Sequence, residues 1–210
     1  RNTNNISIDQ IQISVAIQKM IRSDIGSAGV AFSIDPESGY NKSIVINSSF
    51  GLGELVVSGG VKPDEIILDK RTLQLIDSDP IIMKNLGDKK TKIVYNNDSE
   101  TKEVSTNEFE MKNYSLTNNN AVELGRIIYN LETEYKKLFN ENIGIDVEWA
   151  VDGLDKKIYI IQSRPETIHS NNKNNNLVKY YLNEKSKIIV TGIPIGEQIT
   201  KGPIKNLKNI

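Results

Sequence analysis

The segment that decides the fold is GIDVEWAVDGLDKKIYIIQSRPET, residues 144–167. Its first half alternates polar and apolar residues, and successive side chains of a β-strand point to opposite faces of a sheet. Asp146 and Glu148 therefore share one face. The opposite face carries three apolar side chains: Ile145, Val147 and Trp149. The pattern predicts a strand whose apolar side packs on a core.

The sequence DGLDKK (152–157) predicts a turn that folds a second strand back onto the first. Three pairs of residues then lie opposite one another on the polar face: Glu148 with Gln162, Asp146 with Arg164, and Ala150 with Ile160. Mg²⁺ takes oxygen ligands, and an arginine can clamp a phosphate. One interpretation is a nucleotide-triphosphate site, with Glu148 and Gln162 on the metal and Arg164 on phosphate. The alternative is a half-exposed sheet face with an ordinary Asp146–Arg164 ion pair.

The composition excludes several classes of protein. The 210 residues carry 26 Lys and Arg against 27 Asp and Glu, and the net charge of −1 gives no electrostatic argument for nucleic acid or an anionic membrane. The absence of cysteine excludes a disulfide scaffold, a thiol nucleophile and a zinc–thiolate site. No stretch approaches the roughly 20 apolar residues of a membrane span. We expect a cytoplasmic protein and, without a starting Met, a piece of a longer chain.

The first 116 residues predict strands and turns more than helices. The expected elements are a strand around Val15–Ile21, a strand in 29–34, a turn at Asp35–Gly39, a return strand in 43–50, a short helix around Leu55–Ser58, a strand within 59–70, a hairpin in 81–97 that turns at Gly87–Asp88, and a polar loop over 98–116.

The clearest helical pattern is SLTNNNAVELGRIIYNLETEYKKLF (115–139), with Thr117 as the candidate N-cap. Its apolar residues at helical spacing are Val122, Leu124, Ile127, Ile128, Leu131 and Tyr135. Beyond the hairpin, HSNNKNNN (169–176) is typical of a linker, and its His169, the one histidine of the chain, is expected to be exposed. Residues 187–207 are expected to open a second β-rich unit.

Two shorter motifs are ambiguous on their own. GLGELVVSGG fails the dinucleotide fingerprint and lacks the GK[ST] of a P-loop. Gly51 and Gly53 permit close approach of the backbone to a ligand, and Glu54 can accept a hydrogen bond from a ribose, although turn glycines are the commoner interpretation. In AIQKMI, the strand backbone can pair with adenine and Met20 can pack on the ring, but such a methionine is more often core filler.

Three long segments, taken in order, indicate a known family. They are VAIQKMIRSDIGSAGVAFSIDPESGYNKSIVINSSFGLGELVVSGGVKPDE, SLTNNNAVELGRIIYNLETEY and IGIDVEWAVDGLDKKIYIIQSRPET. Together they resemble the phosphoenolpyruvate synthases (pyruvate, water dikinases) of the PEP-utilizing enzyme family, over nearly the whole chain. The resemblance implies an α+β, ATP-grasp-like nucleotide-binding segment in which helices pack on an antiparallel sheet.

The resemblance also implies roles for nine residues. Glu148 and Gln162 would bind the catalytic Mg²⁺, Arg164 would contact the ATP phosphates as the catalytic residue, and Asp146 would support the site. The other nucleotide-binding positions are Gln18, Lys19 and Met20 on the adenine side, Gly29 on a lining strand, and Glu54 near the ribose.

The same resemblance implies a division into three parts. Residues 1–168 would be the C-terminal portion of the ATP-grasp domain, 169–184 a linker, and 185–210 the truncated start of a swivelling phosphohistidine domain. The family reaction turns ATP, pyruvate and water into phosphoenolpyruvate, AMP and phosphate through a phosphorylated histidine that this sequence lacks. The expected partners are ATP, pyruvate and the remaining domains of the enzyme, with a homodimer left open and neither nucleic acid nor membrane involved. The chain alone should be inactive.

Two alternatives stay open. One is a phosphotransferase of the same architecture with another acceptor, as in the rifamycin phosphotransferases or the pyruvate, phosphate dikinases. The other is a non-catalytic nucleotide-binding or assembly module. A pyruvate-binding barrel elsewhere in the protein would favour the synthase over the first, and titration with Mg-ATP would test the second.

Overall fold

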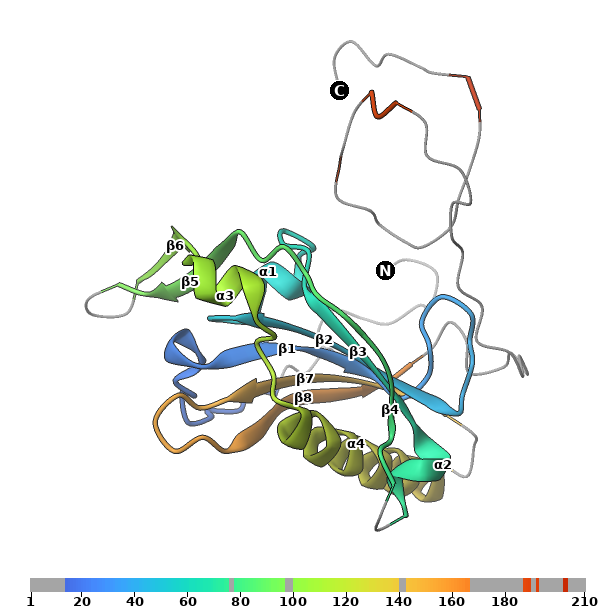
Figure 1. Cartoon of the computed structure of the whole chain (residues 1–210). Coiled ribbons are helices and arrows are strands. Elements are labelled where there is room, and N and C mark those ends of the chain that lie inside the picture. The colour runs from blue at the N-terminus through green and yellow to red at the C-terminus, as the bar shows by residue number, and fades with distance from the viewer. Residues whose placement is uncertain are drawn as a thin grey trace, which may run out of the picture.

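The structure, a computed structural model shown in Figure 1, describes residues 14–75, 78–96, 100–139 and 143–166, together with 187–189, 192 and 202–203. The predicted linker and nearly all of the predicted second unit, His169 included, lie outside the described residues. The domain division therefore stays a prediction.

A six-stranded antiparallel sheet forms the body of the fold (Figure 1). Its strands, in spatial order, are β4 (Ile81–Asn85), β3 (Asp64–Asp69), β2 (Ser43–Phe50), β1 (Ser27–Phe32), β7 (Ile145–Val151) and β8 (Ile158–Pro165). Because β7 pairs with β1, the predicted hairpin of residues 144–167 extends a sheet begun by the first strands of the chain. The expected α+β fold, with helices packed on an antiparallel sheet, is confirmed.

The helix α4 (Asn118–Phe139) covers one face of this sheet (Figure 1). Thr117 caps it as predicted, since its Oγ1 accepts a hydrogen bond from the Asn120 N–H at 3.2 Å. Of the apolar positions predicted for the helix, Leu124 and Ile128 are fully buried. Val122, Leu131 and Tyr135 are partly buried and pack against the same cluster.

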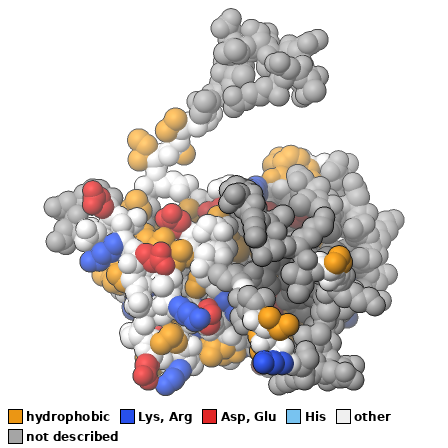
Figure 2. All heavy atoms as spheres, turned by 90° about the horizontal axis from the view of Figure 1, so that it is seen from above, with side chains coloured by type: hydrophobic (Ala, Val, Ile, Leu, Met, Phe, Trp, Pro, Cys, Tyr) orange, Lys and Arg blue, Asp and Glu red, His pale blue; other side chains and the backbone are white. Residues whose placement is uncertain are grey.

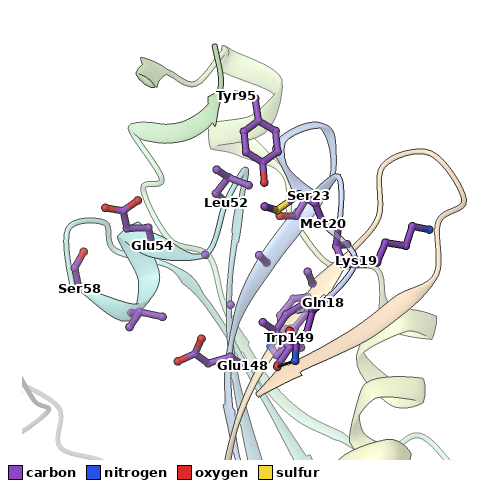
Figure 3. Close-up of a pocket in the computed structure, with 17 residues that line it drawn as sticks. Gln18, Lys19, Met20, Ser23, Leu52, Glu54, Ser58, Tyr95, Glu148 and Trp149 are labelled. Carbon is purple, nitrogen blue, oxygen red and sulfur yellow. Dashed lines mark hydrogen bonds between the residues drawn. The ribbon is translucent and has the colours of Figure 1, made fainter. Parts of the chain in front are cut away.

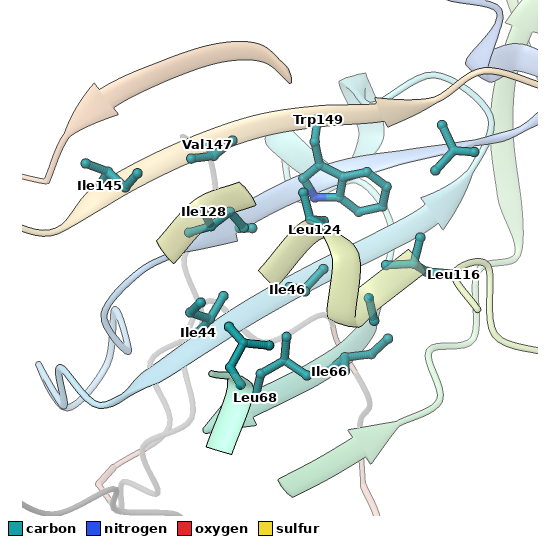
Figure 4. Close-up of a cluster of buried hydrophobic side chains, with 14 of the residues drawn as sticks. Ile44, Ile46, Ile66, Leu68, Leu116, Leu124, Ile128, Ile145, Val147 and Trp149 are labelled. Atoms are coloured by element: carbon teal, nitrogen blue, oxygen red, sulfur yellow. The ribbon is translucent and has the colours of Figure 1, made fainter. Parts of the chain in front are cut away.

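The hydrophobic core lies between α4 and the sheet (Figure 4). Its members include Ile44, Ile46, Ile66, Leu68, Leu116, Leu124, Ile128, Ile145, Val147 and Trp149. Burying a large apolar side chain contributes roughly 1.5–3 kcal/mol, so the four members from β7, which include Val151, strongly favour the register in which they point inward. Asp146 and Glu148 are thereby held on the opposite face of the sheet.

The remaining elements are short. They are the 3₁₀ turn η2 (Ser23–Ile25), α1 (Glu54–Val57), α2 (Lys70–Leu73), β5 (Thr91–Tyr95), β6 (Thr101–Ser105) and α3 (Glu108–Lys112). β5 and β6 form a separate two-stranded sheet, which lies with α3 at one end of the molecule (Figure 1). The predicted turn between β1 and β2 is confirmed: the Gly39 N–H donates to the Asp35 carbonyl at 2.8 Å, with Gly39 at a φ of 72°.

The predicted hairpin over 81–97 is wrong. β4 lies at the edge of the large sheet, whereas β5 pairs with β6. Between them, the Gly87 N–H donates to Asp64 Oδ1 at 2.9 Å, and the Lys89 ammonium pairs with the same oxygen at 2.5 Å. The side chains of Lys89 and Asp64 are fully buried. This ion pair holds the segment against the start of β3, so the chain does not return along β4.

The predicted loop over 98–116 is also wrong, because β6 and α3 both lie in it. Asn107 and Glu110 form a capping box, each accepting a backbone hydrogen bond from the other at the start of α3. Lys92 of β5 in turn pairs with Glu110. The polar residues of this stretch therefore cap a helix and tie it to the small sheet.

The strand predicted around Val15–Ile21 is not formed. Residues 14–22, which we call the strap, belong to no strand, and the side chains of residues 14–20 are exposed. The alternating apolar residues find no surface to cover, since Val15 is 86% and Ile17 99% exposed. The strap is held near β8 by a side chain instead, through a hydrogen bond from Gln18 Nε2 to the Ile161 carbonyl at 3.3 Å.

The surface carries charges of both signs. In Figure 2, acidic and basic side chains are interspersed over the described part of the face in view, in keeping with the net charge of −1. No helix in the described ranges is long and apolar enough to cross a membrane.

Candidate functional site

The β7–β8 hairpin has the predicted register at its polar end. Glu148 pairs with Gln162, and Asp146 pairs with Arg164. The third predicted pair is wrong: Ala150 lies opposite Tyr159, not Ile160, because a register shift occurs between Glu148 and Trp149. The shift follows the polar pairs and leaves them on one face of the sheet.

Asp146 and Arg164 form an ion pair on that face. Arg164 Nε donates to Asp146 Oδ2 at 3.2 Å. The second oxygen, Asp146 Oδ1, is buried and has no hydrogen-bond partner among the described residues. Burial raises the pKa of Asp146, and the positive charge of Arg164 opposes that rise without cancelling it. The carboxyl group thus keeps one acceptor atom that no described residue uses.

A cavity of about 440 Å³ opens above these pairs, and we call it the hairpin cavity. It is lined by Asp146, Glu148, Gln162 and Arg164 from the hairpin, together with Val30, Phe32, Asn47, Val56, Val57 and Val147. It therefore combines two carboxylates, two amides and a guanidinium with apolar walls.

A second cavity, of about 500 Å³, lies beside the strap and is called the strap cavity (Figure 3). Its floor consists of residues from β1, β7 and β8: Ala28, Gly29, Glu148, Trp149, Ala150 and Ile161. Its walls are Gln18, Lys19, Met20, Ile21 and Ser23 on the strap side, and Leu52, Gly53, Glu54, Val57 and Ser58 from α1 and the loop before it. Tyr95 of β5 lies at the end farthest from Glu148 (Figure 3).

The two cavities adjoin, because Glu148 and Val57 line both. All nine residues predicted for the site line one cavity or the other. The strap cavity contains Gln18, Lys19, Met20, Gly29 and Glu54, the hairpin cavity contains Asp146, Gln162 and Arg164, and Glu148 belongs to both. Segments far apart in sequence therefore line two adjoining cavities, which together we call the groove.

The strap wall is positioned mainly by side chains. Besides the hydrogen bond from Gln18 to β8, the Lys19 ammonium lies 5.7 Å from the centre of the Tyr159 ring. Met20 is 68% exposed, so the interpretation of this methionine as core filler is wrong. The side chain is available to a ligand in the cavity.

Two glycines are required by close backbone contacts, one beside the opposite wall of the strap cavity and one on its floor. Gly51 has a φ of 84°, and a Cβ there would lie 2.5 Å from the Ile93 carbonyl oxygen. The neighbouring Leu52 N–H donates to that same oxygen at 2.9 Å, which fixes the loop to β5. On the floor, a Cβ on Gly29 would lie 1.9 Å from the Asn47 carbonyl oxygen. Gly51 is thus more than an ordinary turn residue, since it brings the loop before α1 onto the cavity.

Sequence patterns missed four polar residues of the groove: Ser23, Asn47, Ser58 and Tyr95. No local motif surrounds Tyr95, which reaches the strap cavity from β5 of the small two-stranded sheet. Asn47 follows the apolar residues Ile44, Val45 and Ile46 of β2 and precedes two serines, so the local pattern does not distinguish it from the polar end of a strand. Detecting it would have required the pairing of β2 with β1.

The hairpin cavity offers oxygen donors for a cation. No group of three or more His, Cys, Asp or Glu side chains in the described parts of the chain is arranged to hold a metal. Glu148 and Gln162, paired across the hairpin, instead provide a carboxylate and an amide oxygen. This limited donor set resembles sites where a hard divalent ion is shared between one or two protein groups, waters and a bound phosphate.

Comparison with known proteins gives consistent matches. A family model described as "Pyruvate phosphate dikinase, AMP/ATP-binding domain" matches residues 1–185. The phosphoenolpyruvate synthase of Aquifex aeolicus is 38% identical over 205 residues, which cover 94% of this chain and 24% of that protein. The phosphoenolpyruvate synthase of Escherichia coli is 37% identical over 204 residues, covering 95% of this chain and 25% of that protein.

A more distant relative extends the same pattern. The probable phosphoenolpyruvate synthase of Methanocaldococcus jannaschii is 31% identical over 201 residues, covering 96% of this chain and 16% of that protein. The chain spans about a quarter of the length of the bacterial relatives named above. Since the family model covers well over half of its residues, the chain belongs to the pyruvate phosphate dikinase AMP/ATP-binding domain family.

Proposed function

We propose that this chain forms one wall of the ATP site in an enzyme of the phosphoenolpyruvate synthase type. The observation that supports it best is the junction of the two cavities at Glu148. A nucleoside triphosphate is elongated, with a flat apolar base at one end and charged phosphates at the other. The groove offers both kinds of surface, since small apolar groups lie on the floor of the strap cavity and charged groups line the hairpin cavity.

The strap cavity suits the base and the ribose. Ala28, Gly29 and Ala150 give its floor a surface of small groups on which a flat ring can lie. Its volume of about 500 Å³ falls within the range of roughly 300–1,000 Å³ typical of small-molecule sites. Gln18, Lys19 and Met20 would border the adenine from the strap, and Glu54 would accept a hydrogen bond from the ribose.

The hairpin cavity suits the phosphates and a metal ion. Glu148 and Gln162 would hold Mg²⁺, and the unpartnered, buried Asp146 Oδ1 supports the fit because it is an acceptor that no described residue uses. When bound, Mg²⁺ would neutralise negative charge on the phosphates. Asp146 would act through Arg164, whose guanidinium it holds by a single hydrogen bond.

Arg164 would bind the phosphate that is transferred. Its side chain is 65% exposed, and only its Nε is used by Asp146, so the terminal nitrogens can face a ligand. A guanidinium placed there stabilises the negative charge that develops on the phosphoryl oxygens during transfer. This assigns Arg164 the catalytic role within the chain.

The names of the relatives support pyruvate as the acceptor of the phosphoryl group. In the proposed reaction, ATP and water phosphorylate a histidine outside the chain with release of AMP and phosphate, and the phosphoryl group then passes from that histidine to pyruvate, giving phosphoenolpyruvate. Further groups on the phosphates and the pyruvate site would come from other domains of the protein. The chain supplies the wall that carries the metal ligands, Arg164 and the base site.

The test is a calorimetric titration of the intact protein with Mg-ATP, followed by an assay for AMP release with and without pyruvate. The proposal expects binding and pyruvate-dependent release of AMP and phosphate. Binding without pyruvate dependence would keep the ATP site but reject the synthase reaction in favour of another acceptor or a non-catalytic module. Failure of the intact protein to bind ATP would reject the whole proposal.

A further inference from the structure

Asn47 lies in a row of paired residues that crosses the sheet on the side of the groove. It is paired with Val30 on β1, Val30 is paired with Glu148 on β7, and Glu148 is paired with Gln162 on β8. Directly paired residues on antiparallel strands point to the same face. The Asn47 amide therefore projects from the same face as the two proposed metal ligands.

The surroundings of Asn47 are apolar. It lines the hairpin cavity beside Val30, Val56 and Val57, and its side chain is half-buried. Among the described residues, no hydrogen bond reaches its side-chain amide. A half-buried amide costs stability when it lacks partners, and the strand position would otherwise favour a β-branched apolar residue. A ligand in the cavity would provide the missing partner.

The position of Asn47 relative to the hairpin suggests which part of the ligand it meets. Two strand spacings separate β2 from β7, or about 10 Å between backbones. Arg164 and Gln162 line the cavity from β8, and Asn47 lines it from the side of α1. A chain of phosphates lying over Val30 and Glu148 would have Arg164 on one flank and Asn47 on the other.

We propose that the Asn47 side-chain NH₂ donates a hydrogen bond to a phosphate oxygen of the bound nucleotide. This inference rests on the proposed ATP site and adds a binding residue to it from a strand that contains none of the predicted ones. An amide suits the position because Asp146 and Glu148 already place two carboxylates on the cavity, and a neutral donor adds no further negative charge. A donor to a charged phosphate also forms a stronger hydrogen bond than a neutral pair does.

The test compares the dissociation constants of Mg-ATP and adenosine for the intact protein and three variants. Asn47→Ala should weaken Mg-ATP binding roughly tenfold or more, as expected for the loss of a hydrogen bond to a charged group, and leave adenosine binding unchanged. Asn47→Asp keeps the shape but replaces the donor with a negative charge, so it should weaken Mg-ATP binding further. Asn85→Ala is the matched control: Asn85 lies in the same row, paired with Glu65, but lines neither cavity.

Several outcomes would overturn the inference. One is unchanged Mg-ATP affinity in Asn47→Ala, and another is an equal loss for adenosine, which would indicate a structural role. Mg-ATP binding by Asn47→Asp as tight as that of the unsubstituted protein would make residue 47 a metal ligand instead of a phosphate donor. If Asn47→Ala fails to fold, the nearly isosteric Asn47→Asp still tests the inference, because its affinities for Mg-ATP and adenosine can be compared in the same way. Absence of ATP binding by the unsubstituted protein would overturn this inference together with the proposed function, whereas the other outcomes leave that function standing.

Discussion

Arg164 and Asp146 face each other across the β7–β8 hairpin, and Arg164 Nε donates to only one of the two carboxylate oxygens. The other oxygen is buried without a partner among the described residues, and burial raises the pKa of the group despite the nearby positive charge. Ionisable groups with perturbed pKa values that lie in a cavity are concentrated at functional sites.

Asp146→Asn should change the pH dependence of folding. Because the folded-state pKa lies above the ordinary value of 3.8, the folded protein binds this proton more tightly than the unfolded chain does. The wild-type carboxyl therefore loses stabilising effect as pH rises from the unfolded pKa through the folded pKa. The variant does not titrate, so its free energy of unfolding, relative to wild type, should rise over that window. Urea unfolding between pH 3.5 and pH 7 measures this difference.

Asp155→Asn is the matched control for this prediction. Asp155 lies in the turn of the same hairpin, and the hydrogen bond from the Tyr159 hydroxyl lowers its pKa. Its contribution is present above the unfolded pKa and is lost as pH falls through the folded one, so the variant should become less stable, relative to wild type, as pH rises. The account of Asp146 is contradicted if both variants show the same direction.

The buried ion pair between Lys70 and Glu132 should be costly to break on one side only. It joins α2 to α4 at 2.7 Å, and the two side chains are 8% and 4% exposed. Glu132→Leu leaves a buried ammonium without its counter-ion and should lower the free energy of unfolding by about 3–5 kcal/mol. Adding Lys70→Met should recover most of that loss, as measured by urea unfolding.

An exposed pair on the same helix provides the comparison. Lys137 and Glu134 are 66% and 69% exposed at 2.7 Å, so Glu134→Gln should change stability by less than about 1 kcal/mol. The explanation of the buried pair fails if Glu132→Leu is equally mild, or if the double variant is no more stable than the single one.

Gly51→Ala should impair both folding and nucleotide binding. The added Cβ would meet the Ile93 carbonyl 2.5 Å away, at a residue whose φ is already 84°. We expect a loss of more than about 2 kcal/mol in the free energy of unfolding, and weaker ATP binding because the loop before α1 must move. Gly59→Ala is the control, since Gly59 has a φ of 72° but no atom within 4 Å of the added Cβ. It should cost only about 1–2 kcal/mol. Equal costs would show that the contact with Ile93 is not a constraint.

The sequence predicted the parts of the fold that depend on local pattern. The alternation in β7 and the apolar spacing of α4 both indicate residues that pack on a single core, and the structure confirms both. It also confirms the turn at 152–157, which pairs β7 with β8. The prediction of a hairpin in residues 81–97 was wrong because the observed path of the chain depends on a buried ion pair between Asp64 and Lys89, which no local sequence pattern indicates. The prediction of a strand in the strap was wrong because alternation of polar and apolar residues indicates a strand only where a neighbouring surface exists.

The residues of the candidate site likewise differ in whether a local sequence pattern predicts them. Asp146, Glu148, Gln162 and Arg164 followed from a register within one hairpin. Gln18 came from resemblance alone, and Glu54 from resemblance added to an ambiguous glycine motif; the structure brings both onto the strap cavity. Asn47 enters the groove through pairing between strands that are distant in sequence, so its place became visible only with the complete sheet.

The dependence of ATP affinity on Mg²⁺ in Glu148→Gln tests the central claim, that the polar face of the hairpin binds Mg-ATP. Glu148→Gln keeps the shape of the side chain at the junction of the two cavities but removes its charge. In the intact wild-type protein, and in the control Glu123→Gln on the exposed side of α4, Mg²⁺ should tighten ATP binding at least tenfold. Calorimetric titration of folded Glu148→Gln should show little or no tightening by Mg²⁺. Tightening equal to that of wild type would contradict the assignment of this face as the metal–nucleotide site.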